Sequence, residues 1–439
     1  MKRRAVLAGL GTALAGCGEG SWLGEREPPP LEGRRIPVLL AGQGPTADPR
    51  LAELQVRLPP PTVNPDWPLF GGEPGNAPGH PAGPAGATLA WRSSIGSAAP
   101  GSARLLGRPV VASGVVYAVD GAATVTAVAA GDGRRLWSWR PREARLDDRV
   151  SGGAVGFAGG ILFATLAHGE VAALPAGGGD PIWKVALRAP LRSAPTIARG
   201  LVLVRTADNQ LVALDAATGQ LRWRHAGTIE TAALLGGAPP AVAAGIVVVA
   251  YASGEVVALA LDTGRPLWSE IVARPRRTLA LGTILDITGA PVIDRDRVIV
   301  AGNGGEVAAL DLRTGERIWE LPVGSAETPW VAGEFVFLLS DQGELLCLLR
   351  QGGRVRWVSR LETRSGTGEG REPVVWAGPT LAGGRLWFAG STGELLIVDP
   401  ANGETVGRTR IGARASQAPV AAGGSLFVLT DAAELLAFR

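Results

Sequence analysis

Chemically reactive side chains are scarce in this sequence of 439 residues, which contains two cysteines and three histidines. It has no Cys-x-x-Cys pair and no Cys/His cluster, and this excludes the usual structural zinc sites. Cys347 lies in the apolar run GELLCLL. We therefore expect a buried small hydrophobic residue there rather than a reactive thiol.

The histidines are too dispersed to suggest a catalytic group. His80, His168 and His225 lie far apart in the sequence, and each falls in a turn, a strand end or an entry segment, where a lone histidine is usually solvated. No glycine-rich loop leads from a strand into a helix, so the many glycine pairs, GNGGE among them, indicate turns rather than a phosphate site.

The sequence also lacks a basic stripe with interleaved stacking aromatics, the pattern typical of nucleic-acid binders. Its formal net charge is +3, and Lys2, Arg3 and Arg4 account for that excess. Without them the chain has 40 basic and 40 acidic residues. We predict no nucleic-acid partner.

The apolar run at the N-terminus, Ala5–Ala15, is too short to span a bilayer as a helix. With its basic start and small residues it is typical of a secretory signal, which we place at residues 1–16. The motif LAGC, Leu14–Cys17, resembles a bacterial lipobox. That resemblance implies lipidation of Cys17 and, because residue 18 is not Asp, anchoring at the periplasmic face of an outer membrane. A plain secretory signal with an incidental cysteine is the alternative, and the choice between Sec and twin-arginine export stays open.

Residues 17–66 are proline-rich and lack regular pattern, as in EREPPPLEGRR and RLPPPTVNPDWP. Such segments act as semi-rigid spacers. We predict a tether between the lipid and a folded domain at residues 67–439.

Helical periodicity is absent as well, whereas a motif ending in tryptophan recurs every 40 to 50 residues or so. The copies are AVAAGDGRRLW, ALPAGGGDPIW, ALDAATGQLRW, ALALDTGRPLW, ALDLRTGERIW and CLLRQGGRVRW, and a seventh, IVDPANGETVG, has Gly407 where tryptophan is expected. A period of this length, made of short strands, is typical of propeller blades.

Each unit is predicted to contain four strands. In ALDLRTGERIW, Asp311 ends the third strand, the hairpin turns at Thr314–Gly315, and Trp319 lies on a half-buried outer strand against the next blade. A motif present in nearly every blade indicates packing rather than a ligand site.

The count of second strands predicts an all-β fold, an eight-bladed β-propeller of four-stranded antiparallel blades over roughly 87–439. The last unit ends at AELLAFR without an outer strand, while ATLAWRSSIG near the start is an outer strand without a blade. We predict that this N-terminal strand closes the ring.

The repeats resemble pyrroloquinoline-quinone (PQQ)-type propeller repeats. Together with the lipobox, the segment DWPLFGGEPGNAPGH and the entry LAWRSSIG, the chain resembles the BamB family of lipoproteins in the outer-membrane β-barrel assembly machinery. This resemblance implies a non-catalytic scaffold, monomeric within a hetero-complex, that docks to periplasmic domains of the barrel-forming subunit BamA.

The resemblance places the docking contacts in two inter-blade segments, Thr228–Pro239 and Arg274–Pro291. A family leucine matches Leu234 and a family aspartate matches Asp286, whereas Leu235 and Thr288 replace an arginine and an acidic residue. The second segment mixes arginines, Arg277 among them, with exposed apolar residues, which suits an interface; the alternative is that the apolar residues fold over the rim.

Two other functions remain open. One is a quinone-dependent oxidoreductase, although the sequence has no Cys-Cys pair and no evident calcium-ligating carboxylates. The other is a periplasmic ligand-binding module that uses the central channel. We expect no enzyme activity, no cofactor and no metal.

Overall fold

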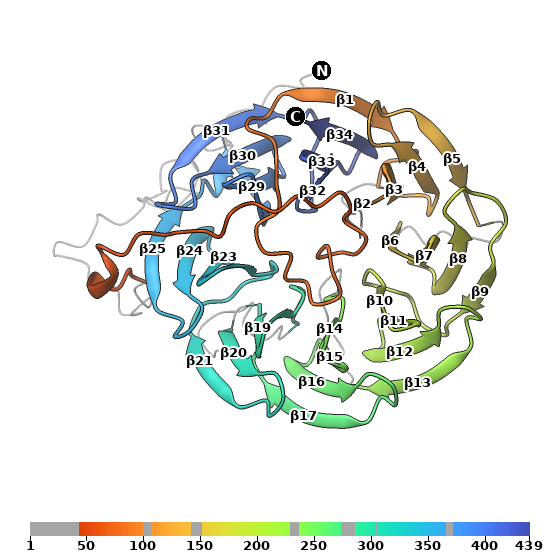
Figure 1. The fold of residues 1–439 in the computed structure, drawn as a ribbon, viewed down its shortest axis with the longest axis horizontal. Helices are drawn as coiled ribbons and strands as arrows, with labels where there is room; N and C mark the ends of the chain where they lie inside the picture. Colours follow the sequence, from red (N-terminus) through yellow and green to blue (C-terminus); the bar gives the residue numbers. More distant parts are fainter. Residues whose placement is uncertain are drawn as a thin grey trace, which may run out of the picture. The chain divides into compact units, whose positions relative to one another are not determined.

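The structure is a computed structural model that describes residues 44–99, 105, 107–141, 152–228, 237–273, 286–303, 305–365 and 372–439. Eight four-stranded antiparallel sheets surround a central axis (Figure 1). The predicted all-β, eight-bladed propeller is confirmed.

Each blade runs from an inner strand at the axis to an outer strand at the rim. The inner strands are β2 (Val110–Ala112), β6 (Gly153–Ala158), β10 (Thr196–Ala198), β14 (Ala241–Ala243), β18 (Val292–Asp294), β22 (Trp330–Ala332), β28 (Trp376–Ala382) and β32 (Val420–Ala422). The second strands are β3 (Val115–Val119), β7 (Ile161–Leu166), β11 (Leu201–Arg205), β15 (Ile246–Ala250), β19 (Arg297–Ala301), β23 (Phe335–Leu339), β29 (Arg385–Gly390) and β33 (Ser425–Leu429).

The outer half of each blade follows the same order. The third strands are β4 (Val125–Ala129), β8 (Glu170–Pro175), β12 (Gln210–Asp215), β16 (Glu255–Ala260), β20 (Val307–Asp311), β24 (Glu344–Leu349), β30 (Glu394–Val398) and β34 (Glu434–Phe438). The outer strands are β5 (Arg135–Trp139), β9 (Trp183–Ala186), β13 (Leu221–Ala226), β17 (Pro266–Ile271), β21 (Arg317–Leu321), β25 (Val355–Arg360), β31 (Thr405–Arg410) and β1 (Leu89–Ser94). We number the blades 1 to 8 by their inner strands.

Burial explains the composition of these strands. The second strands are buried along nearly their whole length because neighbouring blades cover both faces, so they read as continuous apolar runs. The outer strands alternate exposed and half-buried residues, as β31 does, because one of their faces meets solvent. The core therefore lies between the blades.

The ring is closed by strands from the two ends of the folded region, as predicted. β1 pairs with β34 in the sheet β1-β34-β33-β32, with Trp91 opposite Ala437, and the two strands lie side by side in Figure 1. The backbone amide of Arg439 extends this pairing by donating to the carbonyl of Thr88 at 2.9 Å.

Seven tryptophans, in every blade except blade 7, join their blade to the next through their indole N–H groups. Each donates to a backbone carbonyl at the hairpin between the third and outer strands of the following blade; in chain order the pairs are Trp91–Ala130, Trp137–Ala176, Trp183–Ala216, Trp223–Leu261, Trp268–Leu312, Trp319–Arg350 and Trp357–Pro400. The prediction that these residues serve packing is confirmed.

The hairpin of the repeat is shaped to receive the preceding tryptophan. Asp311 Oδ1 accepts hydrogen bonds from the amides of Arg313 and Thr314, both at 2.9 Å. Gly315 has φ +75°, and a Cβ there would lie 2.6 Å from the Trp268 ring. Glycine is therefore required both for the backbone conformation and for the contact between blades.

Blade 7 explains the one copy of the motif without a tryptophan. Gly407 lies on β31 beside Ile397. The next blade has no hairpin before its outer strand, because that blade combines β34 with β1. A tryptophan at position 407 would thus have no hairpin carbonyl to meet.

A belt of residues 62–84 crosses the middle of the ring on one face, where Figure 1 shows it as the orange trace. Its backbone and side chains bond to blades in sequential order: Asn64 to blade 8, Trp67 to blade 1, Pro68 to blade 2, Pro74 to blade 4, Gly75 to blade 5, Gly79 to blade 6 and Pro81 to blade 7. Leu69 covers the remaining gap by packing against Ile197 of blade 3. The belt thus makes one circuit around the axis and contacts all eight blades in order.

The second half of the predicted tether also lies on the propeller. The compact unit begins at Gly44; η1 (Pro49–Leu51) follows Asp48, whose amide donates to Val355 of blade 6 at 2.8 Å. Arg356 Nε donates to the carbonyl of Leu54 at 2.5 Å. Residues 44–66 are therefore bound to the propeller, whereas the sequence suggested a spacer up to residue 66.

Candidate docking face

Two of the predicted docking residues, Asp286 and Thr288, lie just before the inner strand β18, at the end opposite the belt. The belt contacts the turns that follow the inner strands, such as Ser113 and Gly423, whereas the two predicted segments precede β14 and β18. Leu234, Leu235 and Arg277 lie outside the described residues.

Asp286 is the described residue whose position differs most from the expectation of a surface contact. It is 1% exposed, and its Oδ1 lies 3.6 Å from Nη2 of Arg205, which is itself buried on β11. A side chain this deeply buried has no surface to offer a partner. The sequence did not indicate a role for Arg205, because this residue is a single charge at the end of an apolar strand.

Polar partners from blades 3 and 4 surround this ion pair. Arg205 Nη2 donates to Asn209 Oδ1 at 3.2 Å, and its guanidinium carbon lies 6.0 Å from the ring centroid of Tyr251. The Tyr251 hydroxyl is 2.8 Å from Nδ1 of His225. Burial raises the pKa of Tyr251 and lowers that of Arg205, while attraction to Asp286 opposes the second effect.

Thr288 joins blade 5 to blade 6 on the same face. Its hydroxyl donates to the carbonyl of Ala326 at 2.9 Å, and the amide of Ala290 donates to Thr328 Oγ1 at 3.0 Å. The side chain is half-buried, so part of it remains accessible beside the axis.

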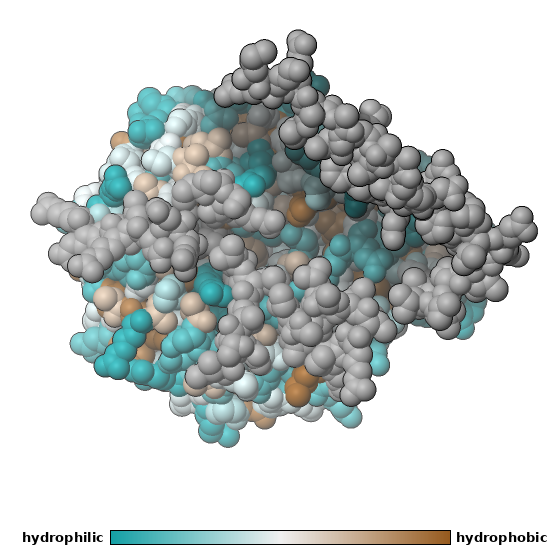
Figure 2. All heavy atoms as spheres, turned by 180° about the vertical axis from the view of Figure 1, so that it is seen from behind, coloured by the Kyte–Doolittle hydropathy of each residue, from teal (hydrophilic) through white to brown (hydrophobic). Residues whose placement is uncertain are grey.

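The described surface of this face is hollowed toward the axis and mixes hydrophilic with apolar residues (Figure 2). Arg108 lies in the interior, with its guanidinium carbon 4.2 Å from the ring centroid of Phe70, a residue of the belt. Burial lowers the pKa of Arg108 to about 10, and attraction to Glu327 opposes this effect. Arg108 therefore stays cationic at neutral pH.

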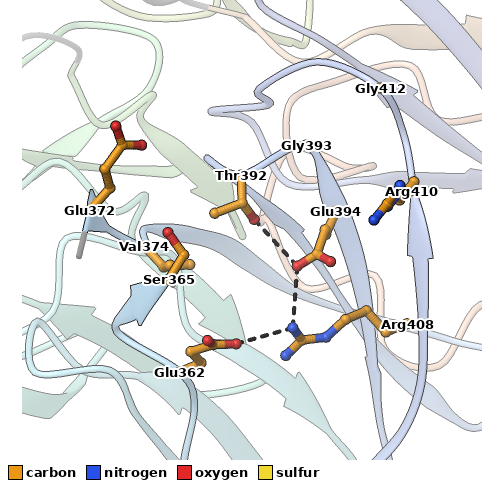
Figure 3. A pocket seen from close by; sticks show the side chains of 10 residues that line it. All are labelled: Glu362, Ser365, Glu372, Val374, Thr392, Gly393, Glu394, Arg408, Arg410 and Gly412. Atoms are coloured by element: carbon orange, nitrogen blue, oxygen red, sulfur yellow. Dashed lines mark hydrogen bonds and ion pairs between the residues drawn. The ribbon is translucent and has the colours of Figure 1, made fainter. Parts of the chain in front are cut away.

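An open cleft of about 550 Å³ lies between blades 6 and 7, beside the small sheet of β26 (Arg364–Ser365) and β27 (Glu372–Pro373). Figure 3 shows Arg408 between two carboxylates, at 3.0 Å from Glu362 and 3.3 Å from Glu394. These pairs bridge the outer parts of the two blades. Their exposure and mutual neutralisation suit a structural contact better than an acid–base pair.

The histidines take structural positions among the described residues. His80 is 6% exposed rather than solvated: Nδ1 lies 2.6 Å from the carbonyl of Pro59, and Nε2 accepts from the amide of Gly384 at 2.8 Å. The expectation of a solvated turn was therefore wrong for His80, which fastens the belt to blade 7.

The described part of the chain contains no group of three or more His, Cys, Asp or Glu side chains arranged to hold a metal ion. Nor does any described helix have the length and apolarity needed to cross a membrane. Cys347 is buried in β24, and burial raises the pKa of its thiol, as expected for a small core residue. Cys17 lies outside the described residues.

This geometry defines a closed propeller of PQQ-type repeats with one belted face and one loop face. The family described as "Outer membrane protein assembly factor BamB" matches residues 83–146 and 122–359, together more than half of the chain. The chain belongs to this BamB family.

Individual relatives agree with that assignment. The outer membrane protein assembly factor BamB of Shigella dysenteriae is 30% identical over 365 residues, covering 78% of this chain and 86% of the relative. The protein of the same name from Escherichia coli K12 is 29% identical with the same coverage.

Solved structures share the fold. BamB from Moraxella catarrhalis has a TM-score of 0.69 at 18% identity, covering 81% of this chain and all of that one. Quinohemoprotein alcohol dehydrogenase from Comamonas testosteroni has a TM-score of 0.62 at 16% identity, covering 85% of this chain and 80% of that enzyme. At these identities the likeness concerns the fold alone.

Proposed function

We propose that the protein is a non-catalytic scaffold of the outer-membrane protein assembly machinery that docks to periplasmic domains of BamA. Lipid on Cys17 would hold it at the periplasmic face of the outer membrane, after removal of residues 1–16. The propeller would act within a hetero-complex and assist the folding of β-barrel proteins.

The position of the two candidate docking segments carries this proposal. Thr228 and Gly237 flank the middle of the first segment, and Ala273 and Asp286 flank most of the second. All four flanking residues belong to blades 3 to 5 on the loop face, away from the belt. The described bases of the two segments therefore lie on neighbouring blades of one face, which suits a scaffold that docks through its loops.

The residues that recur in the blades also favour a scaffold, because they serve the packing of the propeller. The tryptophans, turn glycines and turn aspartates are all engaged in contacts between or within blades. Chemistry specific to this protein must therefore come from residues that differ between blades, and the two segments before β14 and β18 are connections of this kind that carry apolar residues.

Co-purification with BamA from membranes tests the proposal. Leu234→Asp places a charge in the first candidate segment, and we expect a loss of bound BamA with the fold retained. Leu221→Asp is the matched control, because Leu221 is an exposed leucine on the outer strand β13. Undiminished BamA recovery with Leu234→Asp, or equal losses with both variants, would contradict docking through this segment.

Membrane attachment is tested separately. Cys17→Ser removes the sulfur that would carry the lipid, and Leu234→Asp in the same chain removes the proposed contact with BamA, so we expect this double variant to move from the membrane to the soluble periplasmic fraction. Retention of the double variant in the membrane fraction, with Leu234→Asp alone unable to recover BamA, would contradict the lipid anchor.

A further inference from the structure

The two candidate docking segments are tied together at their bases by one buried cluster. Asn209 Nδ2 donates to the carbonyl of Thr228, where the first segment begins. Gly237, near its end, lies against Arg205: a Cβ on that glycine would be 3.4 Å from Arg205 Nη1. Arg205 also pairs with Asp286 in the second segment. One guanidinium therefore contacts residues of both segments.

The cluster spans three blades. Arg205 and Asn209 belong to blade 3, and Asn209 Oδ1 also accepts from the amide of Ala252 in blade 4 at 3.1 Å. Asp286 leads into β18 of blade 5. The cluster thus links three successive blades at the loop face by polar contacts, in addition to the apolar clusters that pack these blades together.

A buried ion pair is a costly way to obtain stability alone. Both charges lose their hydration, and apolar residues of similar volume often stabilise a fold equally well. What a buried pair does supply is geometry, because removing one member leaves an uncompensated charge that forces its neighbours to rearrange. Arg205 and Asp286 are 4% and 1% exposed, so this reasoning applies to both.

We propose that Arg205 and Asp286 are positioning residues for the docking face. Their ion pair sets the bases of the two segments relative to each other, and Asp286 affects partner binding through Arg205, without touching the partner. This inference rests on the proposed docking to BamA. It differs from the family resemblance, which matches Asp286 with a direct contact.

A double-mutant cycle separates the two roles. The affinity of purified BamA periplasmic domains is measured for the full chain, for Arg205→Met, for Asp286→Leu and for the double variant. If the pair positions the segments, each single variant loses affinity about tenfold, because one buried charge loses its partner in the ion pair, and the double variant returns to within about threefold of the parent. If Asp286 touches the partner, its loss persists in the Arg205→Met background and the effects add; this result would overturn the inference.

The controls distinguish positioning from general destabilisation. All affinities are measured below the melting temperature of the least stable variant. The half-buried pair Arg385–Asp399, 3.2 Å apart in blade 7 and far from both segments, is replaced by Arg385→Met and Asp399→Leu as the matched control, for which affinity is expected to stay unchanged. Single variants that melt earlier but bind like the parent would also overturn the inference.

The double variant decides the question even if the single variants fail to fold, since it removes both charges of the ion pair together. Affinity within about threefold of the parent supports positioning, and a loss of tenfold or more shows that the Asp286 carboxylate itself is needed. A parent chain that does not bind the BamA domains would refute the proposed function, and the inference with it; additive losses from a parent that does bind refute the inference alone.

Discussion

Replacing Trp67 with alanine tests how strongly the belt is fastened to the ring. The side chain is 1% exposed, its ring centroid lies 6.0 Å from that of Trp330, and its Nε1 donates to the carbonyl of Phe70 at 3.2 Å. The backbone of Trp67 also pairs with Val111 in both directions, at 2.7 and 2.9 Å.

The expected loss follows from these contacts. Truncating a buried tryptophan to alanine costs about 3–5 kcal/mol, more where the surroundings cannot collapse into the space. Here the belt is held on both sides by backbone hydrogen bonds to different blades, so collapse is restricted. We expect Trp67→Ala to lower the free energy of unfolding by about 4 kcal/mol.

Denaturant unfolding followed by intrinsic fluorescence measures this loss, and limited proteolysis reports local release of the belt. Trp139→Ala is the matched control: Trp139 is half-buried at the rim on β5, and we expect a loss of about 1–2 kcal/mol there. A loss below about 1 kcal/mol for Trp67→Ala, with no new cleavage between residues 62 and 84, would refute the view that the belt is an integral part of the fold.

Three further changes test the contacts between blades. Gly315→Ala places a Cβ 2.6 Å from the Trp268 ring, at a backbone φ of +75°. We expect this variant to reduce the free energy of unfolding by about 2 kcal/mol in denaturant titrations. An unchanged midpoint of unfolding would contradict the packing role of this glycine. Arg317 bridges blades 4 and 5 through Glu270 at 2.6 Å, so Arg317→Ala should cost about 1 kcal/mol in low salt and less in high salt, measured by thermal melts; salt-independent loss would contradict an electrostatic cause. Burial lowers the pKa of His225, so its contribution to stability is complete above pH ~6.5 and is lost as the pH falls through the lower folded-state pKa; the parent should therefore lose more stability between pH 7 and 5 than His225→Gln, and parallel pH profiles would contradict this.

The propeller itself was predictable because its signals are local and repeated. In most blades the third strand, the turn and the tryptophan lie within eleven residues of the sequence. The number of blades and the closing strand could therefore be predicted by counting these motifs and the second strands. Asp311 and Gly315 behave as their turn chemistry predicts. Even the missing tryptophan at Gly407 has a reason in the closure of the ring.

The belt was not predictable because its contacts are neither local nor periodic. DWPLFGGEPGNAPGH bonds to one blade after another through single backbone groups, and such bonds leave no pattern of apolar residues. The prolines up to residue 66 suggested a spacer, and nothing in the sequence indicated that Pro68 and Pro74 offer their carbonyls to the amides of Phe157 and Val242. Apart from a few internal bonds, such as that from the Gly72 amide to the Leu69 carbonyl, the belt bonds to the blades, and a proline-rich sequence suits that purpose as well as it suits a linker.

The cluster around Asp286 escaped sequence reasoning for a similar reason. A single aspartate in a connection rich in arginine reads as a surface residue. Only the fold brings it beside Arg205, which lies two blades earlier, and the pairing is what permits its burial. The question whether Asp286 positions the docking segments or contacts the partner directly therefore arises only from the three-dimensional structure.

Site-specific photo-cross-linking in living cells tests the central claim that the loop face docks to BamA. A photoreactive amino acid is placed at Thr228, whose side chain is exposed at the base of the first segment, and separately at Val63, which is 84% exposed on the belt. We expect a cross-link to BamA from position 228 and none from position 63. A cross-link from position 63 alone would contradict the account, because the belted face and not the loop face would then meet the partner.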